Sequence, residues 1–348
     1  MKILHTADIH LGVKNIKLSI EKQVEIRNEQ NLQIKELFSR AYDEDYDVVL
    51  ICGDLFHSKS VQSKIIANFF DAVKDFSRPV LYIKGNHDEK IDFKAIKPEN
   101  FIVLDDNNPC YIINNVVFWG QVDPKIIEEN YNNSQKNILL LHGDYQKKTS
   151  NDYVDIYSYL NNFKFDYIAM GHVHNYTIQE LYGTKIAYPG SLFSNGFDES
   201  GEKGYLQINI ENQIDIAFIP FSKRKYCVSS CDVSNLIKYH DILNKIKEEL
   251  KENNALSQDL VRIILTGYCE EESEKYLDML KKDLSNYYYV EIIDNTKLRI
   301  DFDKIKKEEL SFKAEFLLLV ENSEEDDNIK NKISQIGIEA LRGDDISI

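Results

Sequence analysis

The sequence VVLICGDLFH, residues 48–57, sets an apolar run directly before a glycine and an aspartate. Such a short run has the length of a buried strand, and its end at Gly53-Asp54 predicts a loop there. Residues 2–10, KILHTADIH, repeat the arrangement. Between the two runs, apolar residues recur near helical period from Val24 to Ala41. The N-terminal part therefore predicts strand, helix and strand.

The alternation of strands and helices continues beyond residue 57. Residues 61–76 carry apolar side chains on one helical face, and the strand VLYIKG follows and ends at Asn86. Further strand patterns then arrive with short turns between several of them, which is typical of sheets. They cover residues 112–120, 137–143, 166–172, 185–190 and 204–210. We predict a mixed sandwich of sheets with helices outside.

The character of the chain changes near residues 221–226, FSKRKY. At roughly 100 to 200 residues per domain, 348 residues suggest two domains, and we place them at 1–222 and 223–348. The second part predicts a small α+β module with a helical tail. Its expected elements are a helix at 236–250, a strand at 261–266, a helix at 272–284, a strand at 287–293 and helices at 308–321 and 327–341.

Composition points to a folded, soluble protein. The chain is 43% hydrophobic and 29% charged, and its apolar runs are well below the roughly 20 residues that a membrane span needs. The N-terminus lacks the apolar stretch of a signal peptide, so we expect no membrane and a cytoplasmic location. The five cysteines are an odd number and widely spread, which does not indicate a disulfide framework. The pair Cys227 and Cys231 is read as buried thiols.

The net charge of −16 argues against a generic nucleic-acid binder, which is normally basic. Both parts are acidic when the chain is cut at residue 222. Bound divalent cations would change the local balance, because two of them add four positive charges where a phosphate would sit. The acidic composition is therefore weak evidence against a phosphate-ester substrate.

Five short segments carry the residues of chemical interest, and each directly follows a predicted strand. Strand ends of α/β sheets gather side chains from distant positions into one crevice. Six of the eight histidines fall in these segments, which ordinary surface or core histidines would not do. The segments are Asp8-Ile9-His10, Gly53-Asp54-Leu55-Phe56-His57, Gly85-Asn86-His87-Asp88, His142-Gly143 and Gly171-His172-Val173-His174.

The DxH and HxH spacings would put two side chains on one face of an extended backbone, because strand side chains alternate. Two ligands could then reach one ion. Mixed imidazole and carboxylate ligands suit Mn, Fe, Zn or Co better than Mg or Ca. The glycines of these segments allow unusual backbone angles and close approach of the backbone to a ligand. The ordered set predicts a dinuclear metal site for phosphate-ester cleavage.

The ordered motifs DxH, GDLFH, GNHD, HG and GHxH resemble the signature of calcineurin-like metallophosphoesterases. The opening MKILHTADIHLG, with LYIKGNHDE and GFDESGEKGY, is similar to the SbcD family of DNA double-strand-break repair nucleases. The closing EALRG and the LTG near residue 265 are similar to its YhaO-like branch. The resemblance covers about residues 1–220 and is looser beyond. It implies a four-layer αββα sandwich with a smaller α+β capping domain and a helical C-terminal tail.

The family's site residues carry over position by position. The resemblance implies that Asp54 bridges the two ions. It also implies that His87 is a non-ligand that protonates the leaving oxygen or stabilises the transition state, that His57 assists it, and that Asp88 orients His87. The implied ligands are Asp8, His10, Asp54 and His174 for one ion, and Asp54, Asn86, His142 and His172 for the other.

The same resemblance implies a manganese-dependent nuclease with 3′ to 5′ exonuclease action on double-stranded DNA and endonuclease action on single strands. It further implies a homodimer and a partner, the SbcC-type ABC ATPase. Two other functions stay open. One is a metallophosphatase or cyclic-nucleotide phosphodiesterase on a small substrate, and the other is a catalytically silent scaffold that binds DNA ends or the ATPase.

Overall fold

The computed structural model describes residues 1–342 except 14–16, 59–60, 92, 94–95, 270–272, 274, 300–301 and 308–310. The chain divides into two compact units. The first unit is Met1–Val228 together with Leu256–Val261 and Tyr287–Tyr289, and the second unit holds the remaining residues after Val228. No helix among the described residues is both long and apolar enough to span a membrane.

The first unit contains a mixed sheet with the strand order β12-β11-β1-β2-β3-β4. Strands β1 to β4 are parallel neighbours, whereas β11 pairs antiparallel with both β1 and β12. Central parallel strands are covered on both faces, so they form from continuous apolar runs. The strands are β1 Lys2–Thr6, β2 Val48–Cys52, β3 Val80–Ile83, β4 Phe101–Val103, β11 Gly204–Ile210 and β12 Ile214–Pro220.

A second sheet of the same unit has the order β5-β6-β7-β8-β10-β9. Its central strands β6, β7, β8 and β10 are parallel, and the edge strands β5 and β9 are antiparallel to their neighbours. The strands are β5 Cys110–Ile113, β6 Val116–Trp119, β7 Lys136–His142, β8 Tyr167–Gly171, β9 Thr177–Leu181 and β10 Thr184–Tyr188.

Alternation along β2 connects the layers. Val48 and Leu50 point into the apolar core between the sheets, where they share one cluster with Ile138 and Leu140 of β7. Val49 and Ile51 point the other way, into the cluster formed with helices α1, Ile20–Asp43, and α2, Ser63–Phe76. Strand side chains alternate with period two, so one strand serves both cores.

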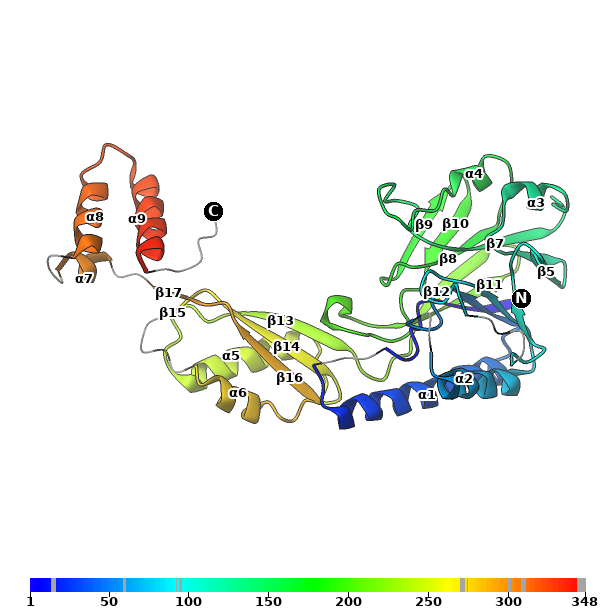
Figure 1. The fold of residues 1–348 in the computed structure, drawn as a ribbon, viewed down its shortest axis with the longest axis horizontal. Helices are drawn as coiled ribbons and strands as arrows, with labels where there is room; N and C mark the ends of the chain where they lie inside the picture. Colours follow the sequence, from blue (N-terminus) through cyan, green and yellow to red (C-terminus); the bar gives the residue numbers. More distant parts are fainter. Residues whose placement is uncertain are drawn as a thin grey trace. The chain divides into compact units, whose positions relative to one another are not determined.

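The outer face of the second sheet packs against the short helices α3, Pro124–Glu128, and α4, Tyr157–Leu160. Figure 1 shows α1 and α2 along the first sheet and α3 and α4 beside the second. The layers are therefore helix, sheet, sheet and helix, and the predicted αββα sandwich is confirmed. The strands β4, β9 and β12 were not predicted from the sequence.

The later part of the chain is a smaller α+β arrangement with helices near its end. Strands β13, Tyr226–Asp232, β14, Leu260–Thr266, and β16, Tyr289–Asp294, form a three-stranded sheet. The predicted starts of the helices at 272 and 308 lie outside the described residues. The other elements are α5 Tyr239–Glu252, β15 Tyr268–Cys269, α6 Leu277–Asp283, β17 Lys297–Leu298, α7 Phe302–Lys307, α8 Phe312–Glu321 and α9 Asp327–Arg342.

Candidate metal centre

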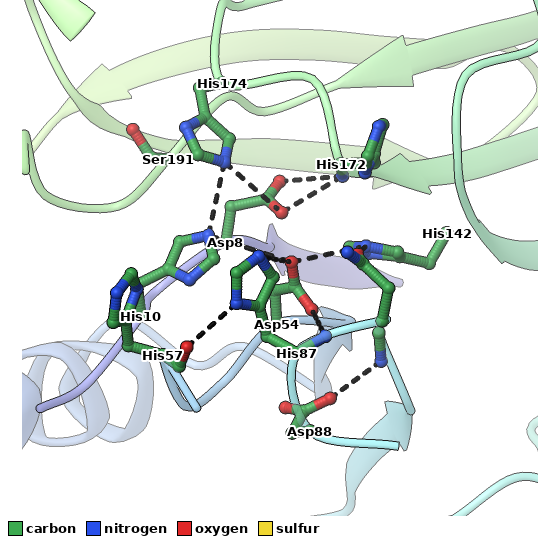
Figure 2. Close-up of polar contacts among 12 residues, drawn as sticks. Asp8, His10, Asp54, His57, His87, Asp88, His142, His172, His174 and Ser191 are labelled. Atoms are coloured by element: carbon green, nitrogen blue, oxygen red, sulfur yellow. Dashed lines mark hydrogen bonds and ion pairs between the residues drawn. The ribbon is translucent and has the colours of Figure 1, made fainter. Parts of the chain in front are cut away.

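The predicted site segments lie at the carboxyl ends of strands from both sheets. Asp8 follows β1, Asp54 follows β2 and Asn86 follows β3, and these three strands are parallel neighbours. His142 ends β7 and His172 follows β8, which are parallel neighbours in the second sheet. Figure 2 shows His10, His87, His142 and His174 around the two aspartates. The first unit therefore builds one polar centre from five separate stretches.

The backbone at this centre is not extended. Asp8, His10 and Asp54 have φ values of 50°, 49° and 50°, and His172 has 99°. These are left-handed conformations that non-glycine residues seldom adopt. The expectation that strand alternation aligns the DxH and HxH side chains is therefore wrong. The strands end before these residues, and tight turns aim the side chains instead.

Asp54 lies in the middle of the centre and is 2% exposed. Its Oδ2 lies 3.5 Å from Nε2 of His142, 3.7 Å from Nε2 of His10 and 4.0 Å from Nε2 of His87. Its Oδ1 accepts a hydrogen bond of 2.9 Å from the backbone N–H of His87. One carboxylate oxygen thus faces three imidazole nitrogens while the other is held by the backbone.

Asp8, His10 and His174 bring ligand atoms within 4.8 Å of one another. Nε2 of His10 lies 3.2 Å from Nε2 of His174, and the latter lies 3.9 Å from Oδ1 of Asp8. The backbone N–H of His172 donates to both carboxylate oxygens of Asp8, at 3.1 and 2.9 Å. Asp8, His10 and His174 are, together with Asp54, the residues that the family resemblance assigns to the first ion.

His142 joins the residues expected at the second ion. Its ligand atom lies within 4.8 Å of those of Asp8 and Asp54, and its Nε2 lies 3.1 Å from Oδ1 of Asn86. The ring of His172 meets the ring of His142 edge-on, with 5.3 Å between centroids. Among the described residues, His172 does not belong to the groups whose ligand atoms all lie within 4.8 Å of one another.

His87 and His57 lie side by side at the open side of the centre. Their rings stack at 5.5 Å, and Nδ1 of His87 donates to the backbone carbonyl of His57 at 2.8 Å. Since Nδ1 carries that proton, Nε2 of His87 is the nitrogen that faces Asp54. The His87 side chain is 40% exposed, so a substrate can reach it.

The expected contact between Asp88 and His87 is absent from the described hydrogen bonds. The buried Asp88 carboxylate instead accepts from the backbone N–H groups of Gly85 at 2.8 Å and Leu55 at 2.7 Å. In the described contacts, the His87 ring is held by the His57 carbonyl and not by Asp88. Asp88 joins the GNHD turn to the GDLFH loop, and thereby positions the backbone of both.

Residues 1–176 match the family model described as calcineurin-like phosphoesterase. The chain belongs to this family. A curated relative, the SbcD subunit of the SbcCD nuclease from Staphylococcus epidermidis, is 23% identical over 376 residues, covering 88% of this chain and 97% of the relative. This relative confirms that the chain resembles SbcD-type nucleases, as the motifs predict.

Solved structures similar to this calcineurin-like phosphoesterase include an archaeal phosphodiesterase and a dimetal phosphatase from Danio rerio. The first is 17% identical, with a TM-score of 0.38, and covers 63% of this chain and 100% of its own. The second is 9% identical, with a TM-score of 0.43, and covers 64% of this chain and 99% of its own.

The charges of the phosphoesterase centre are strongly coupled. Burial raises the pKa of Asp8 to about 6, although His142 and His174 oppose the shift. Burial disfavours the charged form of Asp54 too, but the hydrogen bond and charge of His142, the backbone N–H of His87 and the charge of His10 together lower its pKa to about 2. Burial disfavours protonation of His142, yet Asp54 and Asp8 raise its pKa to about 9. His142 must lose this proton to ligate a metal, because only neutral imidazole binds.

The donor set fits divalent cations. Two imidazole nitrogens lie 3.2 Å apart in His10 and His174, beside the carboxylates of Asp8 and Asp54. His10 is 3% exposed, and its Nδ1 has no hydrogen-bond partner among the described residues. Lone pairs and negative charges that converge in a buried space require compensating positive charge. Imidazole with carboxylate is the ligand mixture of transition-metal sites, so this is a divalent-metal centre.

Two orienting groups were missed from the sequence. Nδ1 of His142 donates to the backbone carbonyl of Cys52 at 2.8 Å, and Nδ1 of His174 donates to Oε1 of Glu199 at 2.7 Å. A backbone carbonyl leaves no signal in the sequence. Glu199 does lie in the family-like segment GFDESGEKGY, so its place in that segment was the available signal.

Proposed function

We propose that this phosphoesterase is a DNA nuclease that cleaves phosphodiester bonds with two divalent ions, most effectively manganese. Its expected activities are 3′ to 5′ exonuclease action on double-stranded DNA and endonuclease action on single strands. The proposed role is double-strand-break repair in the cytoplasm. The observation that carries the proposal is the position of Asp54, one carboxylate oxygen that faces the nitrogens of His10, His87 and His142.

Asp54 is the proposed bridging ligand. Asp8, His10 and His174 complete the first site, and the second is completed by Asn86, His142 and His172. When bound, two such cations lower the pKa of a shared water and clamp the phosphate oxygens. His172 would ligate through its ring, while its backbone N–H is held by Asp8.

His87 is the proposed general acid. Its Nδ1–H is held by the His57 carbonyl, so a protonated ring presents Nε2–H toward the centre. In the reaction, the oxygen of a water that has released one proton to solvent bonds to phosphorus, the bond from phosphorus to the leaving oxygen breaks, and the Nε2 proton moves to that leaving oxygen. His57 supports His87 through its carbonyl and its stacked ring.

The proposed partners follow from the relative, whose name makes it one subunit of the SbcCD nuclease. We propose that this chain pairs with an SbcC-type ABC ATPase and that residues 223–348 act as a capping domain with C-terminal docking helices. A capping module suits a long polymeric substrate, whereas an enzyme for a small phosphate ester does not need one.

Cleavage of labelled DNA with added Mn²⁺ or with EDTA tests the nuclease assignment. Linear duplexes with recessed or blunt ends and circular single strands report the two expected activities. Turnover of bis-p-nitrophenyl phosphate against p-nitrophenyl phosphate separates a diesterase from a phosphatase. Diester turnover without DNA cleavage would favour a small cyclic substrate, and the absence of any turnover with both metals bound would leave a scaffold.

A further inference from the structure

Glu199 is fixed beside the metal centre by contacts on both of its carboxylate oxygens. It ends the 3-10 turn Phe197–Glu199, and its side chain is 13% exposed. Oε1 accepts from Nδ1 of His174 at 2.7 Å. Oε2 accepts from the hydroxyl of the buried Ser191 at 3.3 Å and from the backbone N–H of Asn195 at 3.3 Å.

Lys203 holds the backbone of the same histidine. It is 3% exposed, and its ammonium group donates to the backbone carbonyl of His174 at 2.7 Å. Burying an ammonium group costs free energy unless it is paired, so this contact has a structural purpose. Glu199 and Lys203 therefore hold the ring and the backbone of His174 from one short segment.

The orientation of His174 has a chemical consequence. Because Nδ1–H donates to Glu199, the neutral ring presents its Nε2 lone pair toward Asp8 and His10, as Figure 2 shows for the ring itself. Histidine ligands commonly donate their second N–H to a carboxylate, which fixes the tautomer and makes the ligating nitrogen more basic. By comparison, His142 donates its Nδ1–H to the neutral carbonyl of Cys52.

We propose that the segment Gly196–Lys203 is a clamp for His174, in which Glu199 and Lys203 are positioning residues for the first metal ion. The inference rests on the two ligand sets of the proposed function. It predicts that the two metal ions differ in the number of carboxylates near them. The first ion would have the carboxylates of Asp8 and Asp54 and a third carboxylate behind His174. The second would have only the shared Asp54, so the loss of Glu199 weakens one ion selectively.

Manganese titration of chelator-stripped protein by calorimetry tests the clamp, with bound metal counted after dialysis. In Glu199→Ala, the affinity for one ion should fall about 10- to 100-fold, as for other outer-shell partners, while the affinity for the second ion stays within error. Glu199→Gln keeps an acceptor for Nδ1–H and should lie between Glu199→Ala and the wild type.

Asp198→Ala is the matched control, because it removes an exposed carboxylate from the same turn. It should bind both ions like the wild type. Three results would overturn the clamp. Asp198→Ala could weaken manganese binding as much as Glu199→Ala does, Glu199→Ala could bind manganese like the wild type, or Glu199→Ala and Glu199→Gln could lose the same affinity. Should Glu199→Ala fail to fold, as judged by thermal melting in chelator, Glu199→Gln against Asp198→Ala decides. A wild type that binds no metal pair would defeat the proposed function itself.

Discussion

Four residues of the metal centre hold left-handed backbone angles, namely Asp8, His10, Asp54 and His172. Such angles cost about 1–3 kcal/mol each and persist only where the surroundings fix them. Here the DxH loop is tied to the GDLFH loop, because the N–H of Asp8 donates to the Gly53 carbonyl at 3.1 Å and that of His10 to the Asp54 carbonyl at 3.0 Å. The side chains are thereby oriented before any cation binds.

The bridging role of Asp54 predicts an unequal effect of two substitutions. Asp54→Ala should abolish cleavage and lower bound metal by more than one ion's worth, because Asp54 faces donors from both sites. His10→Ala should spare part of the second site. Elemental analysis of both proteins after dialysis against Mn²⁺ measures the difference. Equal metal loss from the two variants would contradict the bridging role.

His87 should matter for chemistry and not for metal. His87→Ser should keep both ions and near-normal DNA affinity but cut at least about a hundredfold more slowly, because general acids typically contribute about 10²- to 10⁴-fold. KM should barely move, since ground-state binding is untouched. The GNHD turn should survive, because Asp88 holds its backbone.

Single-turnover cleavage and metal content, measured on one preparation of His87→Ser, decide the matter. Loss of metal in proportion to activity would make His87 a ligand. Unchanged cleavage would reduce His87 to a turn residue.

His5 predicts a pH dependence of stability that is separate from the metal centre. It is fully buried, with ring nitrogens bonded to the Tyr167 hydroxyl at 2.8 Å and the Met170 carbonyl at 3.1 Å, and burial lowers its pKa to about 3. The unfolded chain has a histidine pKa of about 6.5, so it binds the proton first as pH falls. Stability from the neutral form is therefore complete above pH 6.5 and lost on the way to pH 3, by about 2 kcal/mol at pH 5.

Urea unfolding of the metal-free protein at pH 7 and pH 5 measures this loss. His5→Gln should remove about 2 kcal/mol of the pH dependence, and His240→Gln, at an exposed position, is the matched control. If the free energy of unfolding fell by the same amount between pH 7 and pH 5 in the wild type and in His5→Gln, the prediction would be contradicted.

At the scale of elements, the sequence predicted the central strands of the two large sheets and missed the edge strands β4, β9 and β12. β2 is buried at every position, so its apolar run stands out. β9 is mostly exposed and β4 has only 3 residues, so neither has a distinct pattern. The site residues were found because they follow central strands. Their left-handed turns, and the contact between His174 and a glutamate 25 positions away, depend on tertiary structure and could not be predicted.

The helices α8 and α9 contact each other, and they carry exposed apolar side chains. Phe312 and Leu319 of α8 are 77% and 70% exposed, and Ile333 and Ile336 of α9 are 38% and 40% exposed. An exposed apolar helical face is a typical docking surface for a partner. We predict that it binds the ATPase; the alternative is that it packs on its own domain.

The double substitution Phe312→Ser and Leu319→Ser should abolish binding to the purified ATPase in a pull-down, while diester turnover stays at the wild-type level. Glu315→Ser changes an exposed polar residue of the same helix and is the control. Retained binding by the double variant would rule out docking through this face.

At the scale of the whole molecule, the negative net charge of the chain is at odds with a negatively charged DNA substrate, and the metal centre accounts for the difference. A chain of net charge −16 repels nucleic acid at long range. The proposed substrate contact therefore depends on the four positive charges that two cations add. The resemblance to SbcD nucleases also implies that the chain forms a homodimer.

The helices α1 and α2 are the expected dimer interface. On α1, Ile20, Val24 and Leu32 are 76%, 42% and 66% exposed, more than a helix that only covers a sheet requires. Light scattering at micromolar concentration should give twice the 40.6 kDa of one chain. Leu32→Glu should halve that mass, because it buries a charge in an apolar interface.

Lys35→Gln is the matched control, because it changes the net charge by the same amount at an exposed position of α1. It should remain dimeric. Diester turnover by Leu32→Glu should persist, since every proposed ligand comes from one chain, while cutting of duplex ends should weaken. A single species of 40.6 kDa for the wild type would refute the dimer, and an unchanged mass for Leu32→Glu would move the interface away from this face of α1.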